Sequence, residues 1–411
     1  MKNLVILGAG TAGTMMANHL VSKLSKKEWN IHIVDQYKTH YYQPGFLFLP
    51  FDIYTEDQVK KVGEKFIPKG VHYIQQKIEK IDAENNLVSL ENGPLAYDLL
   101  IIATGSKIAP AEVDGMLSDE WHKSVFDFYT YEGALALRNK LRDFKGGKLV
   151  VHITEMPIKC PVAPLEFAFL ADSYFHKKGI RDKVDITYVT PLSGAFTKEF
   201  CSKSLGYLLE EKNIKLVTDF AIEQVDFENN KIIDYAETEV PYDLLVTVPT
   251  NMGDEVIERS GLGDDLNFVP THPNTLQSLD HENIFVIGDA TNVPASKAGS
   301  VAHFQAETLT DNILLYINNK PLKEEFDGHA NCFIETGNNK ALLIDFNYVQ
   351  EPVTGNFPFA IIGPLKLLKE SIFNHWGKLA FRWIYWNVLL KGIPIPFVSR
   401  NMSTAGKNIN N

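Results

Sequence analysis

The chain has 411 residues, 45% of them hydrophobic and 22% charged, which is an ordinary globular composition with room for two or three domains. Its formal net charge of −11 argues against nucleic-acid binding as the main task, because affinity for phosphates comes from clustered lysine and arginine. The three cysteines, Cys160, Cys201 and Cys332, lie too far apart for a CxxC or zinc pattern, so no metal site is expected.

The N-terminal segment has the element order of a dinucleotide-binding fold. Asn3–Leu7 reads as a buried strand, Gly8–Gly13 has the spacing Gly-x-Gly-x-x-Gly, and Thr14–Leu24 reads as a helix. A second strand, Ile31–Val34, ends at Asp35. A lone glycine motif is weak evidence, but all these features in this order predict a nucleotide site.

Each residue of this motif has its own predicted role. Gly8 permits the tight turn, Gly10 lets the backbone approach a pyrophosphate, and Gly13 lets the helix pack closely against the strand. The helix N-terminus then faces the phosphates. Asp35 can accept hydrogen bonds from a ribose 2′-hydroxyl, which disfavours a 2′-phosphorylated cofactor. The alternative is a glycine-rich turn in another kind of α/β protein.

Two later segments indicate that the nucleotide is FAD. Tyr97–Ser106 reads as a buried strand ending in Ala-Thr-Gly, and Asn283–Asn292 as another ending in Gly-Asp. They resemble the paired signatures of the glutathione-reductase-like flavoprotein superfamily, in which the Gly-Asp pair meets the ribityl and phosphate part of FAD. The alternative for the aspartate is a strand-end cap. The residues expected at FAD here are Thr104, Gly105, Gly288 and Asp289.

The separation of these segments predicts an α/β fold with two Rossmann-like domains, the second inserted in the first. The FAD-binding domain is expected over 1–110 and 245–325, and the inserted domain over 111–244. Residues 326–411 are expected to form a C-terminal region with amphipathic helices.

The inserted domain lacks the second glycine motif that would hold a nicotinamide cofactor. The matching strand, Lys148–Ile153, is followed by a segment with no glycine between Gly147 and Gly179. Pro164 opens the next helix, where proline is tolerated. Bulky residues in this loop keep the backbone away from a pyrophosphate, so the sequence predicts that the NADH site is absent.

Cys160 and Glu166 occupy the place of the missing motif. Cys160 precedes a helix N-terminus, a position expected to lower the pKa of a thiol. Glu166 falls early in the same helix, within reach as a proton acceptor for a sulfur site. The alternatives are a buried structural cysteine and a simple helix N-terminal charge.

After the last FAD segment, Lys297-Ala298-Gly299 opens a helix whose N-terminus can face the flavin and stabilise an anionic reduced ring. Cys332 lies further on, in HANCF, and a strand is expected over Ala341–Phe346.

With these segments in view, the chain resembles the sulfide:quinone oxidoreductases, most closely their type III branch, along essentially its whole length. The resemblance is carried by GAGTAG, KCPVAPLEF, NIFVIGDATN, the KAG helix, HANCF and NHWGKLAFRWIYWN. It implies that Cys160 and Cys332 flank the flavin ring as a redox pair and that Glu166 manages protons. Sulfide would be oxidised to polysulfide or zero-valent sulfur, with electrons passed through FAD to a membrane quinone.

The resemblance also places residues around the flavin and shows departures. Pro44 and Gly45 are expected to touch the ring, with a surface aromatic loop as the alternative. Some members attach FAD to a cysteine where this chain has Phe126, so non-covalent FAD is expected. Cys201 matches no family cysteine and is interpreted as a bystander. Phe333 and Phe357 are weak candidates for the quinone pocket.

The C-terminal region has the pattern of a membrane-surface helix. Apolar residues recur at three- and four-residue steps at Ile372, Trp376, Leu379, Trp383, Trp386 and Leu390. Nearby cations keep it from spanning a bilayer and suit the headgroup boundary. We therefore expect a peripheral membrane protein, on the cytoplasmic face because no signal peptide is visible. A homo-oligomer is compatible with the sequence. A helix packed on the protein or a partner is the alternative. The tail, residues 403–411, is expected to be mobile.

Three other functions compete with sulfide oxidation. A type II NADH:quinone dehydrogenase shares the expected fold but needs the second glycine motif. A non-catalytic flavin-holding or sulfur-carrying scaffold would not need both cysteines. A flavocytochrome sulfide dehydrogenase subunit would pass electrons to a haem partner and would be exported, and no export signal is visible.

Overall fold

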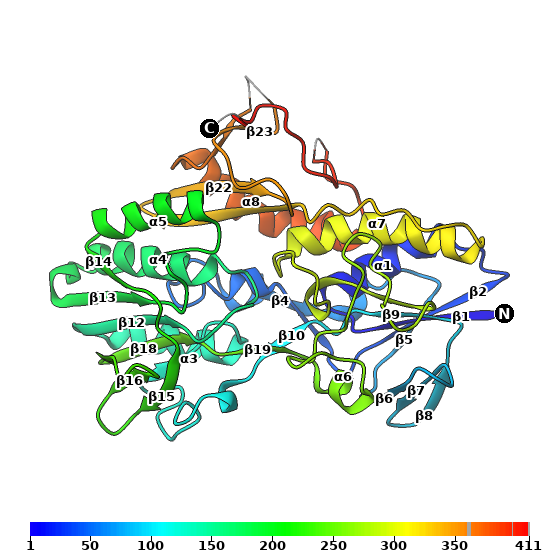
Figure 1. Cartoon of the computed structure of the whole chain (residues 1–411), viewed down its shortest axis with the longest axis horizontal. Helices are drawn as coiled ribbons and strands as arrows, with labels where there is room; N and C mark the ends of the chain where they lie inside the picture. The colour runs from blue at the N-terminus through cyan, green and yellow to red at the C-terminus, as the bar shows by residue number, and fades with distance from the viewer. Residues whose placement is uncertain (360–362, 397, 410–411) are drawn as a thin grey trace.

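The computed structural model describes residues 1–411 apart from 360–362, 397 and 410–411. Its first sheet is parallel and has the strand order β20-β9-β1-β2-β5. The strands are β1 (Lys2–Leu7), β2 (Trp29–Val34), β5 (Val71–Ile74), β9 (Leu99–Ile102) and β20 (Ile284–Val286). Helices α1 (Thr11–Val21) and α7 (Gly299–Ile317) pack together along this sheet (Figure 1). The sheet is therefore built from two stretches of chain that lie far apart in sequence.

The side chains of β1 alternate between two hydrophobic cores, as expected of a strand in the middle of a covered sheet. Leu4 and Ile6 pack into the main hydrophobic core, whereas Val5 and Leu7 pack into a second core on the opposite face. A strand buried on both faces reads as a continuous apolar run, which is how it appears in the sequence.

The second sheet is also parallel, with the order β11-β18-β12-β13-β14. Its strands are β11 (Val125–Phe126), β12 (Gly147–Ile153), β13 (Val184–Val189), β14 (Ile214–Val217) and β18 (Leu244–Val248), and its helices are α3 (Tyr131–Asp143), α4 (Ala163–Lys177) and α5 (Glu199–Glu211). The expected domain boundary at 245 is wrong, because it cuts through β18. The chain leaves this sheet only after Val248.

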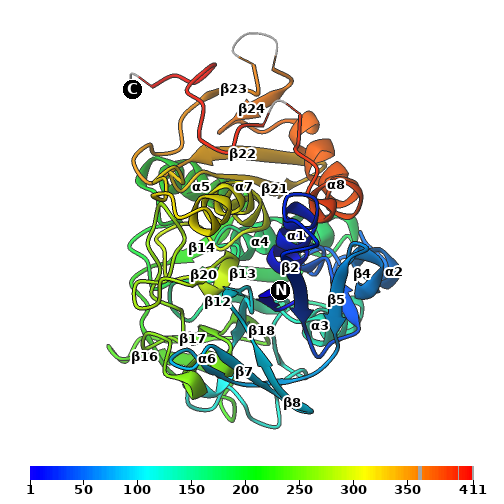
Figure 2. The same ribbon diagram turned by 90° about the vertical axis from the view of Figure 1, so that its right-hand side faces the viewer.

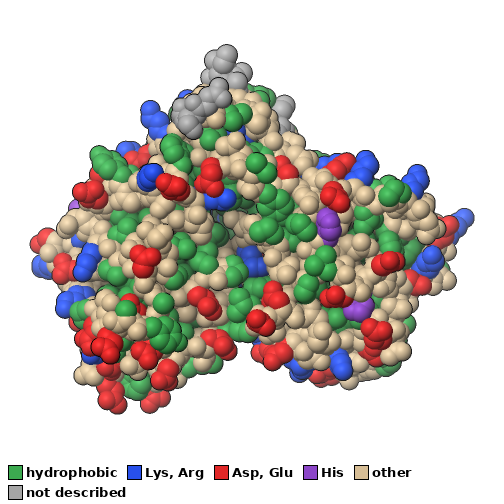
Figure 3. Space-filling model, viewed as in Figure 1, with side chains coloured by type: hydrophobic (Ala, Val, Ile, Leu, Met, Phe, Trp, Pro, Cys, Tyr) green, Lys and Arg blue, Asp and Glu red, His purple; other side chains and the backbone are tan. Residues whose placement is uncertain are grey.

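Short strands complete the two units. β10 (Ser106–Ile108) pairs with β19 (Asn251–Gly253) where the chain passes between them. The remaining small elements are β3 (Thr39–Tyr41), α2 (Glu56–Val59), β4 (Lys60–Val62), β6 (Ile78–Asp82), β7 (Leu87–Leu90), β8 (Gly93–Ala96), β15 (Ile222–Asp226), β16 (Lys231–Asp234), β17 (Glu239–Pro241) and α6 (Glu255–Ser260). Acidic side chains gather over β15 and β16 (Figure 3), in keeping with the net charge of −11.

The C-terminal region forms a cap over both units (Figures 1 and 2). It contains a sheet in the order β21-β22-β24-β23, from β21 (Ala330–Gly337), β22 (Lys340–Phe346), β23 (Gly355–Phe357) and β24 (Leu365–Leu367), followed by α8 (Ile372–Asn387). β21 packs on α4 and α8 packs on β22. In the described part of the chain no helix is both long and apolar enough to cross a membrane.

The tail is more ordered than its polar composition predicts. The Lys407 side chain is 2% exposed, and its Nζ lies 2.8 Å from a carboxylate oxygen of Asp345 on β22. The backbone N–H of Asn408 donates to the carbonyl of Thr354 at 3.0 Å. These contacts hold the tail at 407 and 408, and its last two positions, 410 and 411, lie outside the described residues.

Candidate functional site

A single large cavity runs from the carboxyl ends of β1, β2, β9 and β20 to the start of α4 and the middle of α8. The carboxyl edge of a parallel sheet is where α/β folds bind ligands. The predicted site residues in its wall are Gly8, Gly10, Asp35, Pro44, Thr104, Gly105, Cys160, Glu166, Gly288, Asp289, Lys297 and Gly299. Residues from all three regions of the chain therefore meet at one place.

The glycine motif forms the floor of the cavity at the first turn. Gly8 has φ +96°, and a Cβ there would lie 2.5 Å from the carbonyl oxygen of Ala103. Gly13 does not line the cavity. A Cβ there would lie 1.9 Å from the carbonyl oxygen of Gly8, so the absence of a side chain lets the helix pack closely against the strand. A Cβ on Gly10 would meet no atom within 4 Å, so the backbone at Gly10 faces open space. The close packing and the open approach are those that a pyrophosphate needs.

Asp35 stands where β2 ends and is fixed by the backbone. Its carboxylate accepts hydrogen bonds from the N–H of Ala9 at 2.7 Å and of Tyr37 at 2.8 Å. Burial raises the pKa of Asp35, while the backbone donors act in the opposite direction. The carboxylate is thereby held at the cavity wall as a hydrogen-bond acceptor.

The strand ends of β9 and β20 supply further polar and open positions. Thr104 Oγ1 is buried without a hydrogen-bond partner among the described residues. A Cβ on Gly105 would meet nothing within 4 Å. Asp289 sits in the turn after β20, and burial raises its pKa although Lys297 and Lys159 oppose this. A buried hydroxyl without a partner at Thr104, next to open space in front of the Gly105 backbone, is the arrangement expected at a site for a polar ligand.

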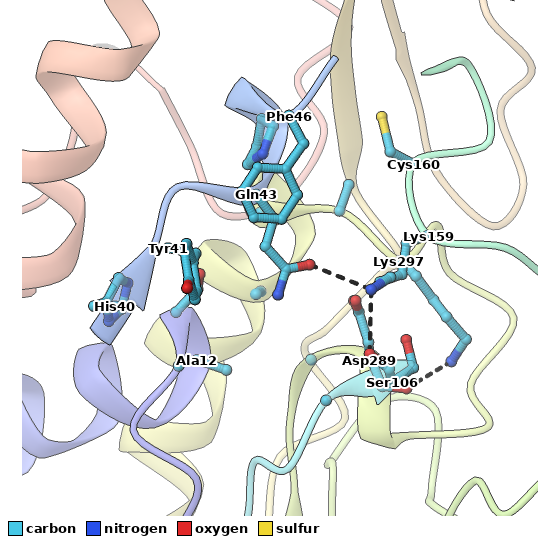
Figure 4. Close-up of a pocket in the computed structure, with 18 of the residues that line it drawn as sticks. Ala12, His40, Tyr41, Gln43, Phe46, Ser106, Lys159, Cys160, Asp289 and Lys297 are labelled. Atoms are coloured by element: carbon cyan, nitrogen blue, oxygen red, sulfur yellow. Dashed lines mark hydrogen bonds between the residues drawn. The ribbon is translucent and has the colours of Figure 1, made fainter. Parts of the chain in front are cut away.

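Lys297 packs against this turn. Its Nζ donates to the carbonyls of Asp289 at 2.9 Å and Thr291 at 2.7 Å, and it lies 3.6 Å from the ring centre of Phe268. Burial lowers the pKa of Lys297 to about 8. Figure 4 shows the side chain turned toward Asp289. Gly299 begins α7, so the N-terminus of that helix reaches the cavity as predicted.

The aromatic segment after β3 lines the cavity only in part. Pro44 is in the wall, but Gly45 is not, because a Cβ on Gly45 would come 2.4 Å from Cγ1 of Val59. The expectation that Gly45 touches a ligand is therefore wrong, since its Cα faces the protein interior. Gln43 accepts a hydrogen bond from Lys159 Nζ at 3.4 Å across the cavity (Figure 4).

Cys160 occupies the loop between β12 and α4 in a left-handed conformation with φ +45°. Its N–H donates to the carbonyl of Lys297 at 2.7 Å, and its carbonyl accepts from the N–H of Ala163. Figure 4 shows the sulfur pointing away from Lys159 and Lys297. Burial raises the pKa of Cys160, with a further contribution from Glu166. The expected lowering by the helix N-terminus is wrong, because desolvation outweighs it.

Cys332 lies on β21, behind the cavity wall. It is not among the residues that line the cavity, but it contributes to the raised pKa of Cys160, so the two thiols interact. Burial raises the pKa of Cys332 to about 12, against the opposing effect of Lys378. Both thiols are free, and they share the influence of Glu166 and Lys378.

Glu166 forms a buried ion pair near the thiols. Its Oε1 accepts from Lys378 Nζ at 2.7 Å and from the N–H of Glu335 at 2.8 Å. The side chain is fully buried, which raises the pKa of Glu166, and its Oε2 has no partner among the described residues. Burial works against the charge of Lys378, but the nearby anions outweigh it and raise the pKa of Lys378. The free Oε2 can accept a proton.

Lys378 was not predicted from the sequence as a site residue. The spacing of polar groups on α8 could have indicated it. Asn374, Lys378 and Tyr385 fall on one helical face, and all three are buried. Tyr385 reaches the first nucleotide turn, since its hydroxyl lies 2.6 Å from His40 Nε2 and 2.7 Å from Thr11 Oγ1. Helix α8 therefore connects the cysteine end of the cavity to the glycine turn.

Other predicted residues lie outside the cavity wall. Phe333 and Phe357 do not line it, and the ring of Phe333 packs against Gly377 of α8. Cys201 is 0% exposed within the hydrophobic core. Phe126 is buried in β11.

The apolar stripe predicted for the last helix is exposed toward its start and buried toward its end. Ile372, Trp376 and Trp383 are 44%, 55% and 63% exposed. Trp386 and Leu390 are buried. The second group packs into the protein, so only the first remains available to an outside surface.

Comparisons with known proteins agree with this geometry. Residues 2–306 match the family model for pyridine nucleotide-disulphide oxidoreductases. The chain is 29% identical to the mitochondrial sulfide:quinone oxidoreductase of Dictyostelium discoideum, over 95% of this chain and 86% of that protein. It is 26% identical to the protein of the same name from Mus musculus, over 94% and 86%. The solved structure of the Aquifex aeolicus sulfide:quinone oxidoreductase shares the fold, with a TM-score of 0.78, 22% identity, and coverage of 96% of this chain and 92% of that one.

Proposed function

Since the chain belongs to the pyridine nucleotide-disulphide oxidoreductase family, we propose that it is an FAD-dependent enzyme that oxidises sulfide and passes two electrons to a quinone. The relatives matched over nearly its whole length carry the name sulfide:quinone oxidoreductase. The observation that carries the proposal is local. A cysteine, a buried carboxylate and a lysine share one cavity with a dinucleotide-binding glycine turn.

The cavity fits FAD at its nucleotide end. Gly10 and Gly105 leave the backbone open to a phosphate chain, and Asp35 is placed for a ribose hydroxyl. The unpartnered hydroxyl of Thr104 offers a further hydrogen bond. When bound, FAD supplies a two-electron carrier between sulfur and quinone. Attachment is non-covalent, since Phe126 stands where a covalent link would need a cysteine.

Cys160 and Cys332 handle the sulfur. In the oxidised protein hydrosulfide attacks one sulfur of their bridge, so that a persulfide forms and the other cysteine leaves as a thiolate. The overall reaction, HS⁻ + quinone + H⁺ → S⁰ + quinol, removes two electrons from the sulfur, which departs as polysulfide or zero-valent sulfur. Burial disfavours the leaving thiolate, and the Lys378 ammonium opposes this by lowering the pKa of both thiols.

Glu166 and Lys378 exchange protons with the sulfur groups. Glu166 keeps Oε2 unpartnered among the described residues, while Oε1 is fixed by Lys378 and by a backbone N–H. Because burial raises the pKa of Glu166, this carboxyl can take up a proton and release it to a persulfide or thiolate.

A type II NADH:quinone dehydrogenase is the less supported function. The loop after β12 contains Cys160 in place of a glycine turn, and the Nζ of Lys159 in this loop is hydrogen-bonded to Ser106 and Gln43. This loop therefore does not offer the open backbone that the pyrophosphate of NADH would need.

Attachment to the lipid surface is proposed through the exposed residues of α8, because quinones partition into bilayers. Ile372, Phe373, Trp376 and Trp383 are all at least 44% exposed. Aromatic side chains of this kind favour the headgroup boundary. Phe333 packs against the same helix and remains a candidate for quinone binding, as does Phe357.

An anaerobic titration tests the function. Sulfide is expected to bleach the flavin absorbance of the purified protein, whereas NADH leaves it unchanged, and decyl-quinone restores it. Replacement of Cys160 or Cys332 by alanine should abolish bleaching, and Cys201→Ala serves as the matched control because Cys201 lies in the core. Bleaching by NADH, or full sulfide-dependent turnover in either cysteine variant, would contradict the proposal.

A further inference from the structure

A second buried carboxylate lies beside the ion pair of the site. Glu335 is on β21, and its side chain is 1% exposed. Its carboxylate oxygens lie 2.9 and 3.0 Å from Nδ1 of His375 on α8. The proposed sulfur chemistry uses neither Glu335 nor His375.

The pair lies between the cavity and the surface. His375 and Lys378 are one turn apart on α8 and face the same side. Lys378 binds Glu166, which lines the cavity, and the backbone N–H of Glu335 binds the same carboxylate oxygen. The exposed fraction rises along this set of side chains, from 0% at Glu166 and 1% at Glu335 to 13% at His375.

We propose that Glu335 and His375 form the path by which protons pass between solvent and the Glu166–Lys378 pair. The inference rests on the proposed function, because sulfide oxidation at a buried site changes its proton count in every turnover. Each turnover with HS⁻ takes up one proton in net terms, and two protons must reach the quinone. The Glu166–Lys378 pair, whose side chains are 0% and 11% exposed, needs a route for this exchange.

The transfers involve protons only. His375 in its cationic form gives a proton to the Glu335 carboxylate, and solvent reprotonates His375. The Glu335 carboxyl then gives its proton to the Glu166–Lys378 pair, so that one proton has moved inward and no electron has moved. The same steps in reverse carry a proton outward. No co-reactant other than water is required.

The charges around the pair suit this role. Glu335 faces Glu166 of α4, Lys378 of α8 and Tyr54. His375 faces Lys177 of α4, and burial together with this lysine lowers the pKa of His375, so its cation readily gives up a proton. Burial raises the pKa of Glu335 to about 8, with Glu166 acting in the same direction and Lys378 against it. A carboxyl that titrates near neutral pH can both accept and donate a proton under working conditions.

The first test replaces Glu335 with glutamine, which keeps the shape and removes the titration. We expect kcat for sulfide-dependent quinone reduction to fall about tenfold or more, with KM for sulfide nearly unchanged and the alkaline limb of the pH profile displaced. Infrared difference spectra should lose a carboxyl band that titrates near pH 8. Glu370→Gln is the matched control, since Glu370 contacts Thr336 next to Glu335 but not the ion pair.

The second test uses His375→Ala, which removes the outer member of the pair. Imidazole added to the buffer should restore much of the lost kcat, a result that a purely structural role cannot produce. His176→Ala is the control, because His176 is 61% exposed on α4 and contacts Asp172 instead.

The outcomes separate the two proposals. If the unaltered protein is not reduced by sulfide at all, the proposed function fails. If it is reduced, but Glu335→Gln keeps the original kcat and pH profile, or His375→Ala loses activity that imidazole does not restore, the proton path is wrong while the sulfur chemistry stands.

Discussion

Lys378 controls the charge balance around both thiols. It lies 2.7 Å from Glu166 in a pair where the two side chains are 11% and 0% exposed. It also lowers the pKa of Cys160 and Cys332 against the effect of burial. A single ammonium therefore stabilises a carboxylate and, when it forms, a thiolate.

Replacing Lys378 with methionine should weaken both effects. The thiol pKa values rise further, so alkylation of the reduced protein by iodoacetamide at pH 8 is expected to slow by about tenfold. The loss of one partner from a buried pair should also lower the free energy of unfolding by about 3–5 kcal/mol.

The double variant Lys378→Met with Glu166→Gln is the control for stability. Because it removes both charges, it should recover much of the lost free energy, and because Glu166 raises the pKa of both thiols, it should also recover part of the alkylation rate. An alkylation rate in Lys378→Met equal to that of the parent at every pH would show that the lysine does not act on the thiols.

The sequence predicted that Cys160 and Glu166 lie together but misjudged one property of the thiol. Both were identified from the loop that replaces a glycine motif, and the cavity wall contains both. The pKa of Cys160 was expected to fall because a helix begins nearby, and instead it rises. Spacing in a sequence reveals the helix but not the depth of burial, which depends on β21 packing on α4 and α8 packing on β21, both from far along the chain.

At the scale of elements, α8 has two distinct faces. One face carries Asn374, Lys378 and Tyr385, which are buried and reach the site. The other carries Trp376 and Trp383, which are exposed. The predicted stripe followed apolar residues alone, so it combined exposed and buried positions and missed the polar inner face that reaches the site.

Replacement of both Trp376 and Trp383 by serine tests the outer face. Binding to phospholipid vesicles in a flotation assay is expected to weaken about tenfold or more, because two large apolar side chains no longer enter the headgroup boundary. Sulfide bleaching of the flavin should persist, since neither side chain lines the cavity.

Tyr207→Ser provides the comparison for this test. Tyr207 is also an exposed aromatic residue, at 61%, but it lies on α5. Equal loss of vesicle binding in this variant would mean that general surface hydrophobicity, and not α8, governs attachment.

Across the whole molecule, local motifs predicted more than long-range packing. The strand, glycine turn and acid near the N-terminus indicated the first nucleotide unit, because each is a short segment with its own physical requirement. The position of β18 across the expected boundary near 245 and the contacts of the tail went unpredicted for a shared reason. β18 and Lys407 are held by partners distant in sequence, β12 and Asp345, and no local pattern encodes those contacts.

Distant contacts also join α1 and α7, and each of these helices contributes a buried histidine to the seam between them. Burial lowers the pKa of His19 and of His303 to about 4, and His19 adds to the lowering at His303. Neither Nδ1 nor Nε2 of His303 has a hydrogen-bond partner in the described part of the chain. The C-terminal segment rests on this seam, since Gly392 approaches His19 and Arg400 pairs with Asp311 of α7.

This seam should make the fold sensitive to acid. The folded pKa of His303 is below the ordinary value of 6.5, so its neutral form is favoured in the folded state. The contribution to stability is therefore complete above pH 6.5 and is lost as the pH falls toward 4, because the unfolded chain takes up the proton first. His303→Phe removes that proton uptake, and acidification from pH 7 to 4.5 should then cost the variant about 2 kcal/mol less free energy of unfolding than the parent. Urea titrations at the two pH values measure the difference, with His176→Phe as an exposed counterpart that should follow the parent. If His303→Phe lost as much stability as the parent over this range, either water would have to enter the seam or Glu307, whose Oε1 lies 3.6 Å from Nε2 of His303, would have to stabilise the protonated ring.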